Sequence, residues 1–352
     1  MATLHSPNRR TFLTGLSAAF AGSVAAPTPS RAQAPGSAVP LRVIDFHNHF
    51  LGHAFTPVVG GKNPPAARRA YFEAVNRNLA SSQALRDSIE TGGVAARVIN
   101  TPIEFFQDPE GDVAPETIRR INDEMAEFVS RHPGRLYGLA TIDPFSGDAG
   151  AREAERAVRE LGLKGVFVQA AKNDLLLDSA QARPSLAAAA ALGVPAFVHP
   201  ITDSQLVKRL RRFGRPGVSL TRSTINSAAL ISLLEGGTFD ELPQLRVVVT
   251  TLAIGAILIV AGLDGDPRLR RDASELSRRH VYIDTMGLNP VLIRSAVDIL
   301  GADHVLAGTD WPIYTERQIP ERLQHALDAC GLAPTEQQLI AWGNTARLLR
   351  II

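Results

Sequence analysis

From residue 41 onward, short β-branched runs alternate regularly with longer amphipathic runs. The amphipathic runs have a helical period; residues 114–132, for example, place Ile118, Ile121 and Met125 on one stripe. Eight runs have the length and composition of strands: 42–46, 94–100, 135–142, 163–169, 194–199, 245–251, 280–284 and 304–309. Strands that each lead into a helix are typical of parallel α/β proteins. Eight such units predict a closed (β/α)8 TIM barrel rather than an open doubly wound sheet.

Two insertions interrupt this alternation. Residues 51–68, after the first strand, are rich in Gly and Pro, and we expect a loop over the barrel mouth there. Residues 201–244, after the fifth strand, hold two helical patterns. The apolar run 252–263 is too short to span a bilayer, and we expect the start of a buried helix.

Polar residues gather where the predicted strands end. The first strand ends in His47 and His49, which alternation along a strand places on one face. An isolated pair of this kind can also be two half-exposed loop histidines. In a barrel, however, the carboxyl ends of all strands meet at one mouth. The other polar residues at these ends are Asn100, Asp143, Gln169, His199, Thr250, Thr251, Asp284 and Asp310.

Three imidazoles and one carboxylate at one mouth form a complete ligand set for a catalytic divalent metal, with room for water or substrate. The alternatives are ordinary ones: a core histidine for His199, and a turn cap before Trp311-Pro312 for Asp310. Asp45 has the same parity as the two histidines, so we expect it either to orient one of them or to serve core hydrogen bonding. The pattern predicts a mononuclear metal site at the C-terminal face of the barrel.

At this point the chain resembles the amidohydrolase superfamily, in the amidohydrolase-related branch that includes aminocarboxymuconate-semialdehyde decarboxylase. The matching stretches are "IDFHNHF", "PAFVHP", "GTDWP" and "LIAWGNTARLL", in this order within about residues 41–350. The resemblance implies that His47, His49, His199 and Asp310 ligate one divalent ion, commonly Zn²⁺. It also implies a small-molecule substrate, and relatives in this branch are often homodimers.

The sixth strand departs from the family pattern, which usually ends it in a catalytic histidine. Here "LRVVVTTLAIGA" offers Thr251 or Leu252, and a threonine hydroxyl is no general base near neutral pH. His53, in the loop after the first strand, and Asp284 are the candidate replacements. Asp310 is the candidate for moving a proton, because a carboxylate beside a cation can accept and return one.

Three further side chains are candidates for substrate binding: Gln169 and Thr251 at strand ends, and Arg222 in the insertion. The planar guanidinium of Arg222 suits a substrate carboxylate, although a solvated helix arginine is the ordinary alternative. His53 is equally compatible with a place on the loop surface.

Residues 1–34 have the organisation of an export signal. They contain the pair Arg9-Arg10, a weakly apolar stretch at 11–26 and Ala-Gln-Ala ending at Ala34. Paired arginines in this setting are typical of the twin-arginine route, which predicts a periplasmic protein with its barrel domain in residues 35–352. A disordered tail is the alternative.

The charge of the chain argues against certain partners, and its cysteine content excludes an intrachain disulfide. The chain has a net charge of +2, from 37 basic and 35 acidic residues. The first 34 residues hold three of those arginines and no acid, so the remainder has 34 basic residues against 35 acidic ones. We expect no nucleic-acid partner and no stable membrane insertion once the signal is removed. Cys330 is the sole cysteine, which excludes an intrachain disulfide, and we expect it to be packed in a helix.

Three functions stay open from the sequence. The first is a metal-dependent carboxy-lyase that removes CO₂ from a small carboxylated substrate, favoured by the branch that the chain resembles. The second is a metal-dependent hydrolase of a small amide, ester or lactone, with His53 or Asp284 positioning the water. The third is a catalytically impaired barrel that keeps the metal and binds a ligand.

Overall fold

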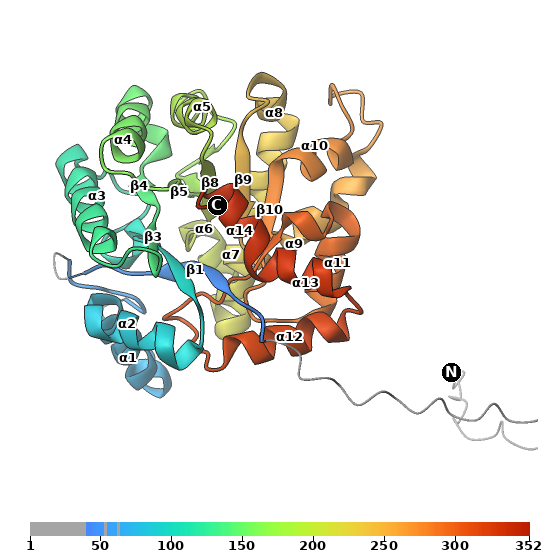
Figure 1. Ribbon diagram of the computed structural model, residues 1–352. Helices are drawn as coiled ribbons and strands as arrows, with labels where there is room; N and C mark the ends of the chain where they lie inside the picture. The colour runs from blue at the N-terminus through green and yellow to red at the C-terminus, as the bar shows by residue number, and fades with distance from the viewer. Residues whose placement is uncertain (1–39, 53–54, 62–63) are drawn as a thin grey trace, which may run out of the picture. The chain divides into compact units, whose positions relative to one another are not determined.

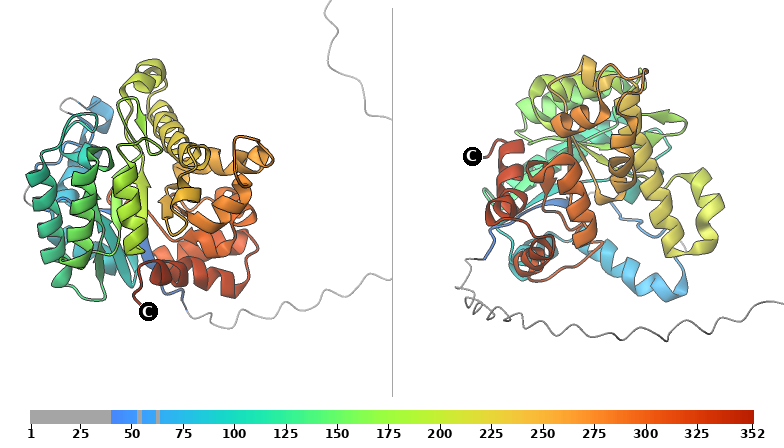
Figure 2. Two further views of the ribbon diagram at one scale, coloured as in Figure 1. Left: turned by 90° about the horizontal axis from the view of Figure 1, so that it is seen from above. Right: turned by 90° about the vertical axis from the view of Figure 1, so that its right-hand side faces the viewer.

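The computed structural model describes residues 40–52, 55–61 and 64–352. The expected export signal at 1–34 and the candidate residue His53 lie outside these ranges. Residues Pro40–Ile352 group into one unit by their contacts. In this unit parallel strands form the inner layer and helices form the outer layer (Figures 1 and 2).

The parallel strands close into a barrel. They pair in the orders β1-β2-β3 and β4-β5-β8-β9-β10-β11. The third predicted strand is divided into β3 and β4, with Leu139 between them. The bounds of these strands are β1 Ile44–His49, β2 Ala96–Asn100, β3 Leu136–Gly138, β4 Ala140–Ile142, β5 Val166–Gln169, β8 Pro195–His199, β9 Arg246–Val249, β10 Val281–Asp284 and β11 Val305–Leu306. The short hairpin β6 Ala171–Lys172 and β7 Leu175–Leu176 follows β5.

Backbone hydrogen bonds close the seam between the first and last strands. Phe46 N donates to Ala307 O, and Asp310 N donates to His47 O, each at 2.8 Å. With β3 and β4 counted as one interrupted strand, eight parallel strands surround the axis, and the predicted TIM barrel is confirmed.

Helices follow the strands and cover the outside of the barrel (Figure 1). Several begin with proline in the first turn, where its missing N–H is no loss, as in α3, α7 and α11. Their bounds are α1 Arg69–Ala80, α2 Ser82–Gly92, α3 Pro115–Ser130, α4 Asp148–Arg159, α5 Arg183–Leu192, α6 Ser204–Leu210, α7 Arg215–Glu235, α8 Thr238–Glu241, α9 Ile254–Ile259, α10 Ala273–His280, α11 Pro290–Leu300, α12 Ile319–Ala329, α13 Pro334–Gln338 and α14 Asn344–Leu348.

The interior of the barrel is a packed apolar core. Inside it, the ring of Phe197 meets those of Phe46 and Phe167 edge-to-face, with centroid distances of 5.3 Å and 5.6 Å. Leu348 and Leu349, at the end of α14, pack against the same core. The end of the chain therefore helps to fill the barrel interior, and Figure 1 shows α14 in front of the strands.

A β-bulge in β1 decides which side chains enter the barrel. Asp45 pairs with Arg97 of β2, whereas Asn48 pairs with Ile99, so β1 carries one extra residue between these points. Because of the bulge, two consecutive side chains of β1 face the interior. Phe46 lies in the interior core, and the ring centroid of His47 lies 5.0 Å from that of Phe197.

The shared parity that we expected for Asp45 and the histidines is therefore wrong. Asp45 forms a fully buried ion pair with Arg97 and accepts hydrogen bonds from the backbone and hydroxyl of Thr309. This is the core hydrogen-bonding alternative. The network connects β1, β2 and the residues after β11.

The remaining expectations for the fold are largely met. The insertion after the fifth strand, where we expected two helices, forms three, α6, α7 and α8. Within 252–263, Ala256 and Ile257 are buried as expected, but Leu258 and Ile259 are 54% and 53% exposed, so that helix is only half covered. Cys330 is buried at the end of α12. Among the described residues, none of the helices combines the length and apolar character needed to span a bilayer.

Candidate metal centre

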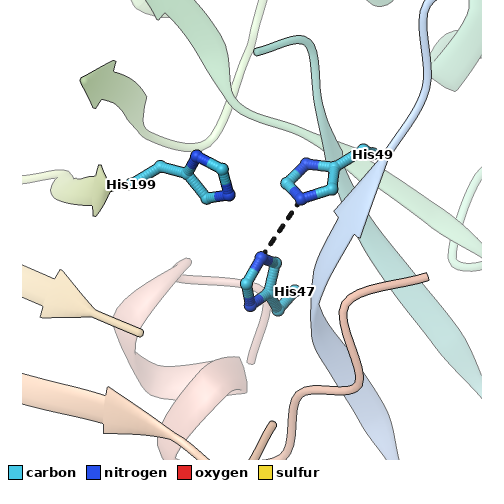
Figure 3. Close-up of side chains that lie close together, drawn as sticks. All are labelled: His47, His49 and His199. Carbon is cyan, nitrogen blue, oxygen red and sulfur yellow. Dashed lines mark hydrogen bonds between the residues drawn. The ribbon is translucent and has the colours of Figure 1, made fainter. Parts of the chain in front are cut away.

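Three imidazoles converge at the carboxyl ends of the strands. His47 and His49 come from β1 and His199 comes from the end of β8, and all three are at least 97% buried. The Nε2 atoms of His47 and His49 are 3.2 Å apart, and one ring nitrogen from each of the three lies within 4.8 Å of the others. Figure 3 shows the three rings pointing toward one another, with Nε2 of His199 facing the other two. Such crowding of nitrogen lone pairs is suited to one shared cation.

Asp310 adds a carboxylate to this cluster. Its Oδ1 lies 3.1 Å from Nε2 of His49 and 3.5 Å from Nε2 of His47. This oxygen is buried and has no hydrogen-bond partner among the residues that the structure describes. Asp310 also has a φ of +66°, a left-handed backbone conformation that costs energy in a non-glycine residue. A buried carboxylate oxygen without a hydrogen-bond partner, within 3.5 Å of two imidazoles, fits a divalent cation.

Each imidazole of β1 is fixed from behind by a second hydrogen bond. Nδ1 of His47 lies 2.6 Å from Oδ2 of Asp284, and Nδ1 of His49 lies 2.7 Å from Oδ1 of Asn100. These contacts fix the ring orientations and leave both Nε2 atoms for a metal, as in many metal sites. Asn100 was predicted only as a residue of the mouth, and its position beside His49 gives it this orienting role.

Asp284 and Thr251 form one unit behind His47. Oδ1 of Asp284 accepts hydrogen bonds from the backbone N–H of Thr251, at 2.9 Å, and from its hydroxyl, at 2.8 Å. Both oxygens of Asp284 are therefore engaged, so it is an orienting group rather than the candidate base that we expected. The hydroxyl of Thr251 is likewise engaged with Asp284 rather than available to a substrate.

Burial and neighbouring charges set the protonation of the imidazoles. Burial, the Arg222 guanidinium and the other two imidazoles hold the pKa of His199 well below its usual range. Burial also lowers the pKa of His49. Burial opposes protonation of His47, but Asp310 and Asp284 outweigh it and raise the pKa of that side chain. Two of the three ligands are thus held neutral near pH 7, the form that binds a metal.

Aromatic rings form a wall around the imidazoles. Phe105 lies 5.0 Å from His49, and Phe167 lies 5.2 Å from His199, measured between ring centroids. Both phenylalanines are at least 95% buried. The wall keeps water away from this side of the centre and strengthens electrostatic interactions within it.

Gln169 lies at the mouth, where it pairs in register with His199. Its Nε2 donates to Pro109 O at 2.8 Å. Lys172 reaches the same loop through Asp112, at 3.0 Å. These contacts fix the segment after β2 against the end of β5. The amide nitrogen of Gln169 is engaged with this segment.

Arg222 of α7 is directly beside the centre. Its Nη2 lies 3.4 Å from Nε2 of His199, and its Nη1 lies 2.6 Å from Oε1 of Glu104. Oε1 of Glu104 is also 3.7 Å from Nδ1 of His199. The alternative of a solvated helix arginine is wrong, because the side chain of Arg222 is only 18% exposed.

Glu104 is a residue of the centre that the sequence analysis missed. It lies in a short 3₁₀ turn, Ile103–Phe105, just after β2. The available signal was a carboxylate in the stretch "NTPIEFF", four residues past a strand end. Its partner Arg222 is 118 residues away in the chain, so only the fold shows the pairing.

A family model described as "Amidohydrolase" matches residues 44–351. Among curated proteins, the gamma-resorcylate decarboxylase of Polaromonas sp. is 28% identical over 262 residues, covering 68% of this chain and 77% of that protein. The 2-amino-3-carboxymuconate-6-semialdehyde decarboxylase of Dictyostelium discoideum is 23% identical and covers 79% of each chain. The resemblance to the aminocarboxymuconate-semialdehyde branch is confirmed.

Solved structures show the same fold. A dihydroxybenzoic acid decarboxylase from Polaromonas sp. JS666, with bound manganese and the inhibitor 2-nitroresorcinol, superposes with a TM-score of 0.74 at 22% identity. It covers 88% of this chain and 97% of its own. A 5-carboxyvanillate decarboxylase from Sphingomonas paucimobilis gives a TM-score of 0.72 at 24% identity, covering 88% and 99%. Both structures therefore share the fold of this chain.

Proposed function

Because this chain belongs to the amidohydrolase family, we propose that it is a metal-dependent carboxy-lyase that removes the carboxyl group of a small aromatic acid as CO₂. The two curated relatives described above are both decarboxylases, and this supports the reaction class. The aromatic wall of Phe105 and Phe167 supports a planar, apolar substrate body.

The position of Arg222 is the observation that carries this proposal. Its guanidinium lies 3.4 Å from the His199 nitrogen that faces the other imidazoles. Glu104 neutralises the guanidinium on its Nη1 side, but Nη2 faces the centre, where a guanidinium beside a divalent ion is repelled unless an anion lies between them. A carboxylate meets this need, because it can contact the ion and accept charge-assisted hydrogen bonds from Arg222.

The residues of this chain would hold the ion and the substrate as follows. His47, His49, His199 and Asp310 would hold the ion, and Asp284 and Asn100 orient the two imidazoles of β1. When bound, the ion would supply positive charge against the negative charge that develops on the substrate. Three imidazoles and a carboxylate favour zinc, so we propose Zn²⁺, and elemental analysis of the isolated protein tests this.

In the reaction, the bond between the ring carbon and the carboxyl carbon breaks, and its electron pair stays on the ring carbon. A proton takes the place of the carboxyl group, and CO₂ leaves without any oxidant. We assign this transfer to Asp310, which would take up a proton from water before the bond breaks and deliver it to the ring carbon through Oδ2, the oxygen not turned toward the imidazoles. Water is kept from the carbanion-like state by the buried phenylalanines.

The sixth-strand histidine of the family has no equivalent at the end of β9, where Thr250 and Thr251 stand. Thr251 is instead part of the support of Asp284. The hydrolase alternative needed Asp284 or His53 to position water. Asp284 is engaged with His47, and this favours decarboxylation.

A substrate panel tests the proposal. The metal-loaded protein is incubated with 2,6-dihydroxybenzoate, 5-carboxyvanillate and related aromatic acids, and CO₂ is measured with the decarboxylated product. We expect one CO₂ per product molecule for at least one acid. In Arg222→Met we expect kcat/KM to fall about 100-fold with unchanged metal content. Amine or ring-opened product from a matching ester, amide or lactone panel, without CO₂, would replace this proposal by the hydrolase one.

We also propose export by the twin-arginine route, supported by Arg9-Arg10 and the small residues that end at Ala34. Replacing both arginines by lysine keeps the charge and removes the motif. We expect the protein with both changes to stay in the cytoplasmic fraction, and undiminished recovery from the periplasm would refute the route.

A further inference from the structure

Glu104 and Arg222 form an ion pair inside the proposed substrate site. Their side chains are only 8% and 18% exposed, and the bond from Nη1 of Arg222 to Oε1 of Glu104 is 2.6 Å long. Oε2 of Glu104 accepts from the backbone N–H of Thr202, at 3.2 Å, and from its hydroxyl, at 3.3 Å. The carboxylate is thus anchored on one side and engages the guanidinium on the other.

This anchoring fixes the direction of Arg222. Nη1 contacts Glu104 and the hydroxyl of Thr202, whereas Nη2 is turned to the His199 nitrogen at the centre. The planar fork of a guanidinium cannot turn one nitrogen without moving the other. A contact that holds Nη1 therefore also aims Nη2 at the place where the substrate carboxylate binds.

The charge of Glu104 has a second consequence. A carboxylate substrate carries its negative charge before the reaction and loses it when CO₂ departs. A strong interaction with that carboxylate stabilises the bound substrate more than the transition state, which slows the chemical step. An anion beside Arg222 weakens this ground-state interaction while leaving the guanidinium in place.

We propose that Glu104 is a positioning residue that aims Arg222 at the substrate carboxylate and limits how tightly Arg222 holds it, so that CO₂ is released. The inference rests on the proposed function, because it concerns the carboxylate that the reaction removes. It assigns to Glu104 a role in turnover that none of the residues predicted from the sequence fills.

The variant Glu104→Gln separates this role from a merely structural one. Glutamine keeps an oxygen that accepts from Arg222 but carries no charge. With benzoate as an unreactive carboxylate probe, titration calorimetry on the metal-loaded variant should show a dissociation constant about tenfold lower than wild type. The kcat of the variant should fall about tenfold and its KM should fall as well, so that kcat/KM changes less than either.

Two matched variants serve as controls. Glu90→Gln makes the same chemical change in an ion pair with Arg135 on the exposed surface, and it should leave benzoate binding and kcat as in wild type. In an Arg222→Met background, Glu104→Gln should no longer tighten benzoate binding, because the guanidinium through which it acts is missing.

The benzoate measurement needs no turnover, so it is independent of the proposed function. A wild-type protein that releases no CO₂ but shows the expected change in benzoate affinity would refute the proposed function alone. Benzoate affinity in Glu104→Gln that is unchanged or weaker than in wild type would overturn the inference, even if the wild type is an active decarboxylase.

Discussion

At the scale of single residues, Asp284 shows how far the centre depends on groups that do not face it. It is 97% buried, and its Oδ2 lies 2.6 Å from Nδ1 of His47. Burial opposes ionisation of this carboxyl, but the charge and hydrogen bond of His47 outweigh it and lower the pKa of Asp284. Asp284 is thus held as an anion that orients the ring and makes its Nε2 a stronger metal ligand.

Asp284→Asn should therefore weaken metal binding. The amide has nearly the same shape but no charge, and we expect the metal dissociation constant to rise about 10- to 100-fold. Competition with a fluorescent chelator measures this constant. Asp303→Asn, at an exposed carboxylate, is the control. Equal metal affinity in both variants and wild type would show that Asp284 does not support the centre.

His280 links stability to pH outside the centre. Its ring stacks on Phe239 at 4.7 Å, and its Nδ1 lies 2.8 Å from Leu245 O. Burial lowers the pKa of His280 to about 4, from 6.5 in the unfolded chain. The unfolded state therefore takes up this proton first as the pH falls, so the contribution is present above pH 6.5 and is lost toward pH 4.

His280→Gln should remove this part of the acid sensitivity. We expect the free energy of unfolding of the variant to fall less between pH 7 and pH 5 than that of wild type, by urea denaturation at each pH. His325→Gln, at an exposed position of α12, should follow wild type. A pH dependence of His280→Gln identical to wild type would contradict the assignment.

At the scale of elements, the sequence predicted the barrel well because its signal is repeated. Each strand is a short β-branched run, each helix has an apolar stripe, and eight repetitions compensate for errors at single boundaries. The division of the third strand at Leu139 and the two-residue β11 show where such boundaries fail.

The sequence could not predict the β-bulge of β1, because one extra residue leaves no mark in composition or period. The bulge turns Asp45 to Arg97 and the histidines to the interior. It is also why the roles of the strand-end residues were only partly foreseen. Which of Asn100, Asp284 and Glu104 contacts which imidazole depends on register and on loop paths that meet only in the folded barrel.

Gly308, just after β11, shows how tightly the strands of the centre are packed. A Cβ at this position would lie 2.9 Å from Cβ of Asp284 and 3.1 Å from Cβ of His47. Neither atom is the flexible end of a side chain, so the strands themselves would have to move.

Gly308→Ala should therefore destabilise the protein by about 1–3 kcal/mol and weaken metal binding by displacing His47 and Asp284. Denaturation and chelator competition measure the two effects. Gly262→Ala, where a Cβ would meet nothing within 4 Å, is the control. If Gly308→Ala keeps wild-type stability and metal affinity, the backbone around Gly308 can shift at little energetic cost, and this prediction is wrong.

At the scale of the whole molecule, the metal connects distant parts of the chain. Its proposed ligands come from β1, from β8 and from the residues that follow β11, so they are brought together only in the folded barrel. A ligand that binds only the folded state stabilises it by mass action.

Removing the metal should therefore lower the stability of the entire barrel. At a free metal concentration 1,000-fold above the dissociation constant, the expected contribution is about 4 kcal/mol. Thermal unfolding with and without a chelator measures this change. In His199→Ala the same chelator should have almost no effect, and a chelator-sensitive melting temperature in that variant would place the metal elsewhere.

The most direct test is to measure CO₂ release from an accepted aromatic acid as the metal-free protein is refilled stepwise with Zn²⁺ or Mn²⁺. If His47, His49, His199 and Asp310 hold one ion that the reaction requires, CO₂ release rises in proportion to occupancy and reaches its maximum at one ion per chain. CO₂ release that is already complete in the metal-free protein, or absent at full occupancy with every acid of the panel, would contradict the account.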